Sequence, residues 1–251
     1  MSDALVRHYR AARRDPELAF LEGFHALKHA LRFGAEVLEA VATDPDELER
    51  LSEELAPDLA GSLSARVTPV EADVLAELVP QAPRTGVVAI AHRPRVEVAK
   101  VMADERPVPL VLLEDPRTMG NMGACVRVAA AADAAGVLTT GGNDPWHPDA
   151  LRGGAGLHFA LPVAVVGELP DGDRPLVAID PEGENLRPDE LPARAILAFG
   201  TERYGLSPEL LARADARIGV PMREGVSSLN LATSVAAVLF AQRLRREPGA
   251  A

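Results

Sequence analysis

Polar residues with ligand-binding chemistry gather in three short segments of this 251-residue chain, at 114–127, 199–209 and 218–232. The first segment follows an apolar run and contains Asn121 and Arg127, together with glycines that would let the backbone turn tightly and approach a ligand. A strand, a glycine turn and a helix are nevertheless common in α/β proteins. Taken alone, Arg127 is equally well a surface residue of a helix.

The other two segments combine ligand-binding and capping residue types. Glu202 lies in a glycine-rich loop after a predicted strand, and open α/β sheets bind ligands in the loops at the carboxyl ends of their strands. Ser207 and Pro208 then have the pattern of a helix start. Ser228 and Asn230 precede the last predicted helix, and both types are preferred helix caps. A solvated Glu202 and a capping Ser–Asn pair are therefore the alternatives to a ligand site.

The elements that position these segments form two series. In the first, apolar spacing predicts three helices, over Ala19–Phe33, Asp44–Leu55 and Thr68–Leu78. Short apolar runs predict strands over Val37–Ala42 and Gly86–Ala91. Strands that alternate with helices indicate an α/β sandwich.

The second series begins after a polar stretch at 93–106, which predicts a linker or a connecting helix. Its apolar runs are nearly continuous, as in parallel strands that are buried on both faces. The predicted strands are Val108–Leu113, Val137–Thr140, Val163–Val166, Leu176–Asp180 and Ala195–Phe199. A helix over Ser228–Arg246 closes the chain, and its basic end suits the helix dipole.

Composition excludes several classes of protein. Hydrophobic residues make up 47% of the chain, which is enough for a genuine core. The single cysteine, Cys125, excludes an internal disulfide and a cysteine-based metal site, so we expect no metal. No stretch approaches the roughly 18 apolar residues of a membrane helix, and residues 1–14 do not resemble a secretory signal. We therefore expect a cytoplasmic protein without a membrane partner.

The net charge of −11 argues against indiscriminate binding to nucleic acid. Most of it lies at residues 36–80, where twelve Asp/Glu and two Arg give −10. Residues 1–33 instead hold six Lys/Arg against four Asp/Glu. Four arginines cluster there, either as a binding surface or as a solvated helix start: Arg7, Arg10, Arg13 and Arg14.

The order and spacing of the three segments resemble the signature motifs of the SpoU/TrmH family of RNA 2′-O-methyltransferases. The matching patterns are Asn121-x5-Arg127, Phe199-Gly200-x-Glu202-x-x-Gly205-Leu206, and Ile218-x-x-Pro221-Met222 followed by Ser228-Leu229-Asn230. The resemblance covers about Val108 to Arg246. Phe20–Leu27 and Thr85–Ala89 in addition resemble the L30e-like substrate-binding domain that precedes many catalytic domains of the family.

The resemblance implies an α/β fold class with two domains. Residues 1–93 would form the smaller L30e-like domain, 94–107 a linker and 108–251 a SPOUT-type parallel-sheet domain with a trefoil knot. Knots are nearly absent from other folds, so no sequence pattern alone suggests one. A homodimer through the C-terminal domain would complete each site.

The resemblance also implies a cofactor, a substrate and a set of site residues. The cofactor would be S-adenosylmethionine, and the substrate a structured RNA, either ribosomal or transfer RNA. The catalytic residues would be Arg127, Asn121, Glu202, Ser228 and Asn230. The cofactor would lie against Phe199, Gly200, Thr201, Glu202, Gly205, Ile218, Val220, Pro221, Met222, Ser228, Leu229 and Asn230. The arginines Arg7, Arg10, Arg13 and Arg14 would contact RNA.

Arg127 is better suited to positioning than to proton abstraction, because a guanidinium stays protonated in proteins. Its planar fork fits a phosphate. A dinucleotide-dependent oxidoreductase is disfavoured by the lack of a Gly-x-Gly-x-x-Gly pattern after the first strand of the second series. An inactive RNA-binding relative and an enzyme that methylates a base nitrogen are the remaining alternatives. The sequence leaves the RNA, and a housekeeping or resistance role, open. The segment Asn143–Pro148 favours packing over base stacking.

Overall fold

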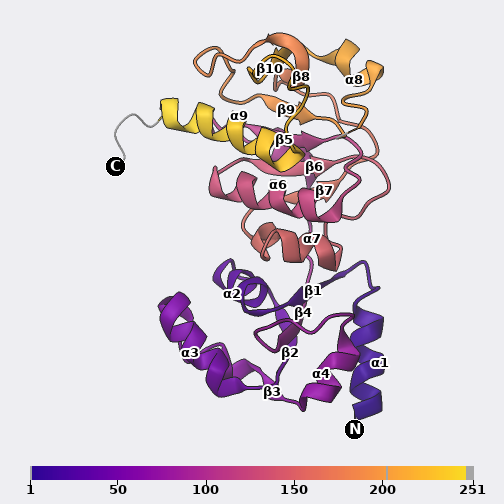
Figure 1. Cartoon of the computed structure of the whole chain (residues 1–251), viewed down its shortest axis with the longest axis vertical. Coiled ribbons are helices and arrows are strands. Elements are labelled where there is room, and N and C mark those ends of the chain that lie inside the picture. Colours follow the sequence, from indigo (N-terminus) through magenta and orange to yellow (C-terminus); the bar gives the residue numbers. More distant parts are fainter. Residues whose placement is uncertain (1, 202, 247–251) are drawn as a thin grey trace. The chain divides into compact units, whose positions relative to one another are not determined.

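The computed structural model describes residues 2–201 and 203–246 (Figure 1). These residues divide into two compact units. Unit 1 consists of residues 2–95 and 146–160, and unit 2 of residues 96–145, 161–201 and 203–246. The segment Trp146–Ala160, which lies within the range 108–251 expected for the C-terminal domain, groups with the N-terminal unit.

Unit 1 contains a four-stranded sheet in the order β1-β4-β2-β3, in which β2 and β3 are parallel and the other pairs antiparallel. Its strands are β1 (Leu18–Glu22), β2 (Val37–Ala42), β3 (Thr68–Pro69) and β4 (Val87–His92). Its helices are α1 (Ser2–Ala12), α2 (Phe24–Arg32), α3 (Pro45–Leu55), α4 (Ala72–Leu78) and α7 (Pro148–Gly153), with 3₁₀ turns at Pro57–Leu59, Ser64–Arg66 and Leu157–Phe159.

Two helix predictions in unit 1 were wrong at their beginnings. Residues 18–22 form strand β1, and helix α2 starts only after Gly23, whose φ of 91° a helix cannot contain. The apolar residues before Gly23 are buried beside β4, so tertiary pairing overrode their helical spacing. Thr68 and Pro69 pair with β2 before α4 begins. By contrast, Asp44 caps α3 as predicted by accepting a hydrogen bond from the Glu47 N–H at 2.8 Å.

The segment Trp146–Ala160 is held within unit 1 by a group of contacts that we call the clasp. Glu22 at the end of β1 accepts hydrogen bonds from Arg13 and, at 2.7 Å, from Arg152. The His29 ring bonds the Ala155 carbonyl at 2.7 Å. Gly156 has a φ of 74° and lies so close to α2 that a Cβ would stand 2.6 Å from the Ala26 carbonyl oxygen.

Trp146 and His147 of the segment Asn143–Pro148 have local structural roles. Trp146 is 5% exposed, and its ring contacts Phe159 with centroids 5.2 Å apart. His147 caps α7 by accepting a hydrogen bond from the Asp149 N–H at 3.2 Å. The prediction that Trp146 packs within the fold is therefore confirmed.

Unit 2 contains a six-stranded, fully parallel sheet in the order β10-β8-β9-β5-β6-β7. Its strands are β5 (Leu110–Leu113), β6 (Gly136–Thr139), β7 (Val163–Val165), β8 (Leu176–Asn185), β9 (Ile196–Phe199) and β10 (Ala216–Gly219). Its helices are α5 (Val98–Met102), α6 (Met119–Ala131), α8 (Pro208–Arg213) and α9 (Leu231–Arg246). The five predicted strands are present, whereas β10 was not predicted as a strand.

Arg174 ties the segment expected as a linker to the core of unit 2. Its side chain is buried, and it donates hydrogen bonds to the carbonyls of Met102, Val108 and Asp104 at 3.0, 3.0 and 2.7 Å. Val101 and Met102 of α5 are buried in the same core. The segment before β5 is therefore an ordered part of this unit.

Across 2–201 and 203–246, no helix is long and apolar enough to span a membrane, and no cluster of three or more His, Cys, Asp or Glu side chains could hold a metal ion. The cytoplasmic location and the trefoil knot stay predictions.

Candidate active site

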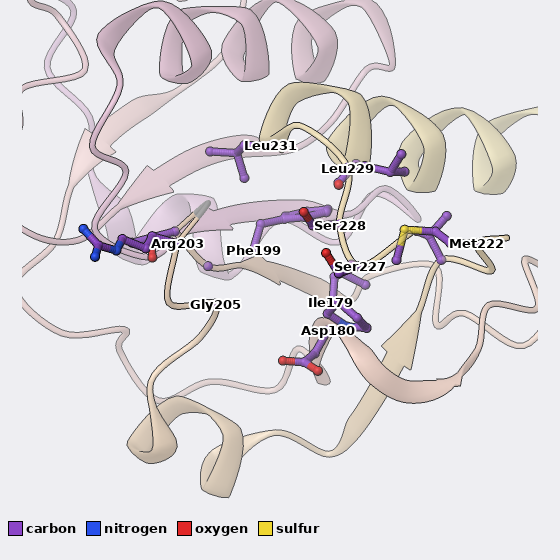
Figure 2. A pocket seen from close by; sticks show the side chains of 15 residues that line it. Ile179, Asp180, Phe199, Arg203, Gly205, Met222, Ser227, Ser228, Leu229 and Leu231 are labelled. Atoms are coloured by element: carbon purple, nitrogen blue, oxygen red, sulfur yellow. The ribbon is translucent and has the colours of Figure 1, made fainter. Parts of the chain in front are cut away.

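A pocket of about 330 Å³ opens in unit 2 at the middle of β8, at the carboxyl end of β9 and at the segment between β10 and α9 (Figure 2). Strand β5 lies in the middle of the sheet. Strands β6 and β7 lie on one side of it, and strands β9, β8 and β10 lie on the other side. Ligands of open α/β sheets bind at the carboxyl edge, near such a change of direction. The topology thus places the pocket where a ligand is expected.

Most residues predicted to hold the cofactor meet in this pocket. Phe199, Gly200, Thr201, Gly205, Val220, Met222, Ser228 and Leu229 line it. Ile218, Pro221 and Asn230 do not line it, and Glu202 lies outside the described residues. Sequence reasoning missed Ile179, Asp180, Pro181, Arg203, Ser227, Leu231 and Ser234. A signal for Asp180 existed, since it is an acid at the carboxyl end of a predicted strand.

The loop after β9 is closed on itself. Thr201 and Gly205 exchange two backbone hydrogen bonds of 3.0 Å each, and the Thr201 hydroxyl accepts a third from the Tyr204 N–H at 3.0 Å. Gly205 has a φ of 66°, and a Cβ on Gly200 would overlap the Gly205 backbone. The two glycines of the motif therefore permit a tight loop that borders the pocket with its backbone.

Glu114 fixes the position of this loop relative to β5. Its two carboxylate oxygens accept hydrogen bonds from the Ser207 hydroxyl at 2.6 Å and from the Ser207 N–H at 2.7 Å. The Ser207 hydroxyl in turn caps α8 by accepting from the Leu210 N–H at 3.2 Å. The predicted capping role of Ser207 is confirmed.

The loop between β5 and α6 is braced from the β6 side. Asp115 has a φ of 45°, and its N–H donates to the Thr140 hydroxyl at 3.0 Å. The Asn143 side chain donates to the Pro116 carbonyl at 2.9 Å. Asn143 thereby supports the first motif.

Asn121 and Asn230 join the first and third motifs, although 109 positions separate them. The Asn230 amide donates to Asn121 Oδ1 at 3.1 Å, and Asn230 Oδ1 accepts from the N–H groups of Ala232 and Thr233 at 3.0 and 3.3 Å. Asn230 is thus the N-cap of α9, and it also links α9 to α6. These two helices pack against each other.

Arg127 lies on α6 with its side chain exposed, and it is not a lining residue of the pocket. Within 2–201 and 203–246 it has no hydrogen-bond or ion-pair partner. The structure therefore brings Asn121, Ser228 and Asn230 to one region of unit 2, and it leaves Arg127 without a partner among the residues it describes.

The four clustered arginines of unit 1 differ in their surroundings. Arg13 pairs with Glu22, and its guanidinium stands 5.2 Å from the centroid of the Phe20 ring. Arg10 donates to the Glu77 carbonyl at 3.2 Å. Arg7 and Arg14 are exposed. Arg13 thus has a structural role in the clasp, whereas Arg7 and Arg14 are available to a partner.

Sequence comparison decides the family. The profile of the SpoU rRNA Methylase family matches residues 109–240. The chain belongs to this family. An uncharacterized tRNA/rRNA methyltransferase of Mycobacterium bovis is 34% identical over 212 residues, which are 78% of this chain and 72% of the relative. A 23S rRNA (adenosine(1067)-2′-O)-methyltransferase of Streptomyces azureus is 26% identical, with 92% of this chain and 87% of the relative aligned.

The fold agrees with the family. The SpoU methyltransferase AviRb from Streptomyces viridochromogenes, crystallised with AdoMet, superposes with a TM-score of 0.76 at 22% identity, over 97% of this chain and 98% of that one. The predicted family and the predicted α/β fold class, with a parallel C-terminal sheet and a smaller N-terminal sheet, are confirmed. Membership of the methylase family excludes the oxidoreductase alternative.

Proposed function

We propose that this protein binds S-adenosylmethionine in the pocket of unit 2 and transfers its methyl group to a ribose 2′-oxygen of a structured RNA. The observation that carries the proposal is that the second and third family motifs meet in one pocket at the carboxyl edge of the sheet. The Streptomyces azureus relative is named for the same reaction on 23S rRNA.

The residues of the pocket fit such a cofactor. A volume of about 330 Å³ is within the range of small-molecule sites. Phe199, Leu229 and Met222 offer apolar surface to a flat heterocycle, and the hydroxyls of Ser227 and Ser228 offer hydrogen bonds (Figure 2). The glycine loop lets backbone amides approach the ligand closely. The cofactor supplies the methyl group on a positively charged sulfur.

Arg127 acts in this proposal by positioning the substrate. The new bond joins the ribose 2′-oxygen to the methyl carbon, the carbon–sulfur bond breaks, and the hydroxyl proton leaves to water or to an RNA phosphate. Guanidinium groups are poor bases in proteins, so the proposal assigns Arg127 no proton transfer. Arg127 instead holds the neighbouring phosphate with its planar fork and orients the hydroxyl for attack.

A homodimer is the second part of the proposal, because Arg127 does not line the pocket of its own unit. Helix α9 carries Phe240 and Leu244 on one face, since they are four positions apart, and they are 36% and 71% exposed. An apolar face of this kind favours association. The expected sedimentation behaviour is that of a dimer, and Leu244→Asp should shift it towards the monomer. A wild-type monomer at micromolar concentration would contradict this part.

The rim of the pocket suits RNA. Arg203 lines the pocket, and its guanidinium stands 5.2 Å from the centroid of the Tyr204 ring, which is 76% exposed. Unpaired RNA bases stack on aromatic rings and on arginine planes. Stacking of this kind suits ribosomal RNA and transfer RNA equally. We propose Arg7 and Arg14 of unit 1 as additional contacts to RNA phosphates.

The deciding experiment supplies the purified protein and methyl-labelled S-adenosylmethionine to total RNA from a strain that lacks the gene. Label on one ribose, mapped by nuclease digestion and mass spectrometry, is the expected result. Label on a base nitrogen would show that the methyl acceptor is a base and not the ribose. Absence of cofactor binding in calorimetry, with RNA binding retained, would instead favour the inactive RNA-binding alternative.

A further inference from the structure

The pocket contains a carboxylate that neither the family motifs nor the sequence analysis assigned. Asp180 lies within β8 and lines the pocket beside Ile179 and Pro181 (Figure 2). Its side chain is only 12% exposed. Among the lining residues that the structure describes, it is the acidic one.

A large irregularity in the sheet places Asp180 there. Arg217 and Ile218 are adjacent in β10, yet they pair with Ala178 and Glu184 of β8. The intervening residues 179–183 of β8 therefore have no partner in β10, although Ile179 still pairs with Phe199 of β9. Such bulges redirect side chains and are frequent beside active sites. Here the bulge turns Asp180 into the pocket.

The two oxygens of Asp180 have different surroundings. Oδ1 accepts hydrogen bonds from Arg217 Nη2 and from the Glu182 N–H, each at 2.8 Å. Oδ2 has no hydrogen-bond partner within 2–201 and 203–246. A Cβ built on Gly205 would stand 3.9 Å from Oδ2, so this oxygen faces the glycine loop. One oxygen thus anchors the side chain, and the other remains free at the pocket wall.

We propose that Asp180 is a cofactor-binding residue, whose Oδ2 accepts a hydrogen bond from an N–H or O–H group of S-adenosylmethionine. This inference rests on the proposed function. The cofactor offers such donors at two places, the adenosine part and the α-ammonium group. Charge-assisted hydrogen bonds to a carboxylate held by an arginine are strong and directional.

Glu182 provides a matched control. Its carboxylate also pairs with Arg217 at 2.8 Å, but its side chain is 82% exposed and it does not line the pocket. Asp180→Asn and Glu182→Gln each remove one negative charge next to the same arginine. They differ in whether the lost carboxylate faces the pocket.

The test is calorimetric titration of each variant with S-adenosylmethionine and with S-adenosylhomocysteine. We expect Asp180→Asn to weaken both affinities by about tenfold, and Glu182→Gln to change them by less than about twofold. A purely structural role would lower the melting temperature of the free protein without this selective loss. Unchanged affinity in Asp180→Asn, or equal losses in the two variants, would overturn the proposal.

A third ligand locates the donor. Methylthioadenosine keeps the adenosine part and lacks the α-ammonium group. If Asp180→Asn weakens the affinity for methylthioadenosine, the donor lies on the adenosine part. If it weakens the affinity only for the other two ligands, the donor is the α-ammonium group. Both results support the proposal. If Asp180→Asn does not fold, Asp180→Glu keeps the charge and displaces the free oxygen, and it should weaken binding several-fold. A wild-type protein that binds none of the three ligands would instead refute the proposed function and this inference with it.

Discussion

The clasp of unit 1 and the pocket of unit 2 both contain a carboxylate held by arginine, and they use it differently. In the clasp, Glu22 is 2% exposed, and each of its oxygens has an arginine partner, Arg13 or Arg152. In the pocket, one oxygen of Asp180 accepts two hydrogen bonds, and the other has no partner among the described residues. An acid whose hydrogen-bonding capacity is used up stabilises the fold. One with spare capacity at a pocket wall is available to a ligand.

The same contrast holds for the basic residues. Arg13 is committed to Glu22, whereas Arg127 has no partner within 2–201 and 203–246. Arg203 contacts the exposed Tyr204 ring at the pocket rim. The comparison thus predicts that substitutions in the clasp change stability, and that substitutions around the pocket change binding or turnover.

The largest effect is expected at Glu22. Glu22→Ala leaves Arg13 and Arg152 without their shared partner, and breaking a buried ion pair costs about 3 kcal/mol of unfolding free energy. Urea denaturation measures the loss. Trp146 is the single tryptophan and is buried in unit 1, so its fluorescence reports on this unit. The exposed Glu182→Gln should cost less than about 0.5 kcal/mol. A Glu22→Ala protein of normal stability but weak cofactor binding would reverse the comparison.

Arg127→Lys should reduce kcat by about a hundredfold and leave the calorimetric affinity for S-adenosylmethionine unchanged. Lysine keeps the charge but loses the planar fork, so the phosphate and the attacking hydroxyl are misaligned. Single-turnover methylation of the mapped RNA measures the rate. The assigned role is wrong if this variant methylates at the wild-type rate.

Tyr204→Ala should raise the KM for RNA by about tenfold, because one stacked base contributes on the order of 1–3 kcal/mol. Tyr204→Phe keeps the ring and should retain most of the affinity. Filter binding with the mapped RNA, and calorimetry with the cofactor, separate the two ligands. A loss of cofactor affinity equal to the loss of RNA affinity would show that the ring supports the pocket instead.

The smallest effect concerns His29 in the clasp. Partial burial lowers the pKa of His29, and its Nδ1–H donates to the Ala155 carbonyl. The unfolded chain then binds the proton more readily, so stability should decrease as the pH falls below about 6.5. The melting temperature of unit 1, followed by Trp146 fluorescence, should drop less between pH 7.5 and 5.5 in His29→Asn than in the wild type. Equal drops in His29→Asn and in the wild type would exclude this role.

Local sequence signals predicted those elements whose formation depends on near neighbours. Val37–Ala42 is a strand over the same residues as predicted, and Asp44 caps the following helix, because both signals are short-range. Residues 18–22 carry a helical spacing but pair with β4, a contact that lies about 70 positions away in the chain. Helix α7 and strand β10 were not predicted, and α1 was named only as an alternative reason for the arginine cluster. The motifs around Gly200 and Ser228 located the pocket, since their spacing is a family signature.

The sequence by itself determined the family, the α/β class and the motif residues, because these follow from residue order and local periodicity. The tertiary structure alone decided which distant residues meet. In the structure, Trp146–Ala160 groups with the N-terminal unit, and Asn121 accepts a hydrogen bond from Asn230. A bulge in β8 places Asp180 at the pocket. The physical reason is that hydrogen-bond partners and sheet register are chosen by three-dimensional packing, and a linear pattern carries little information about contacts over such separations.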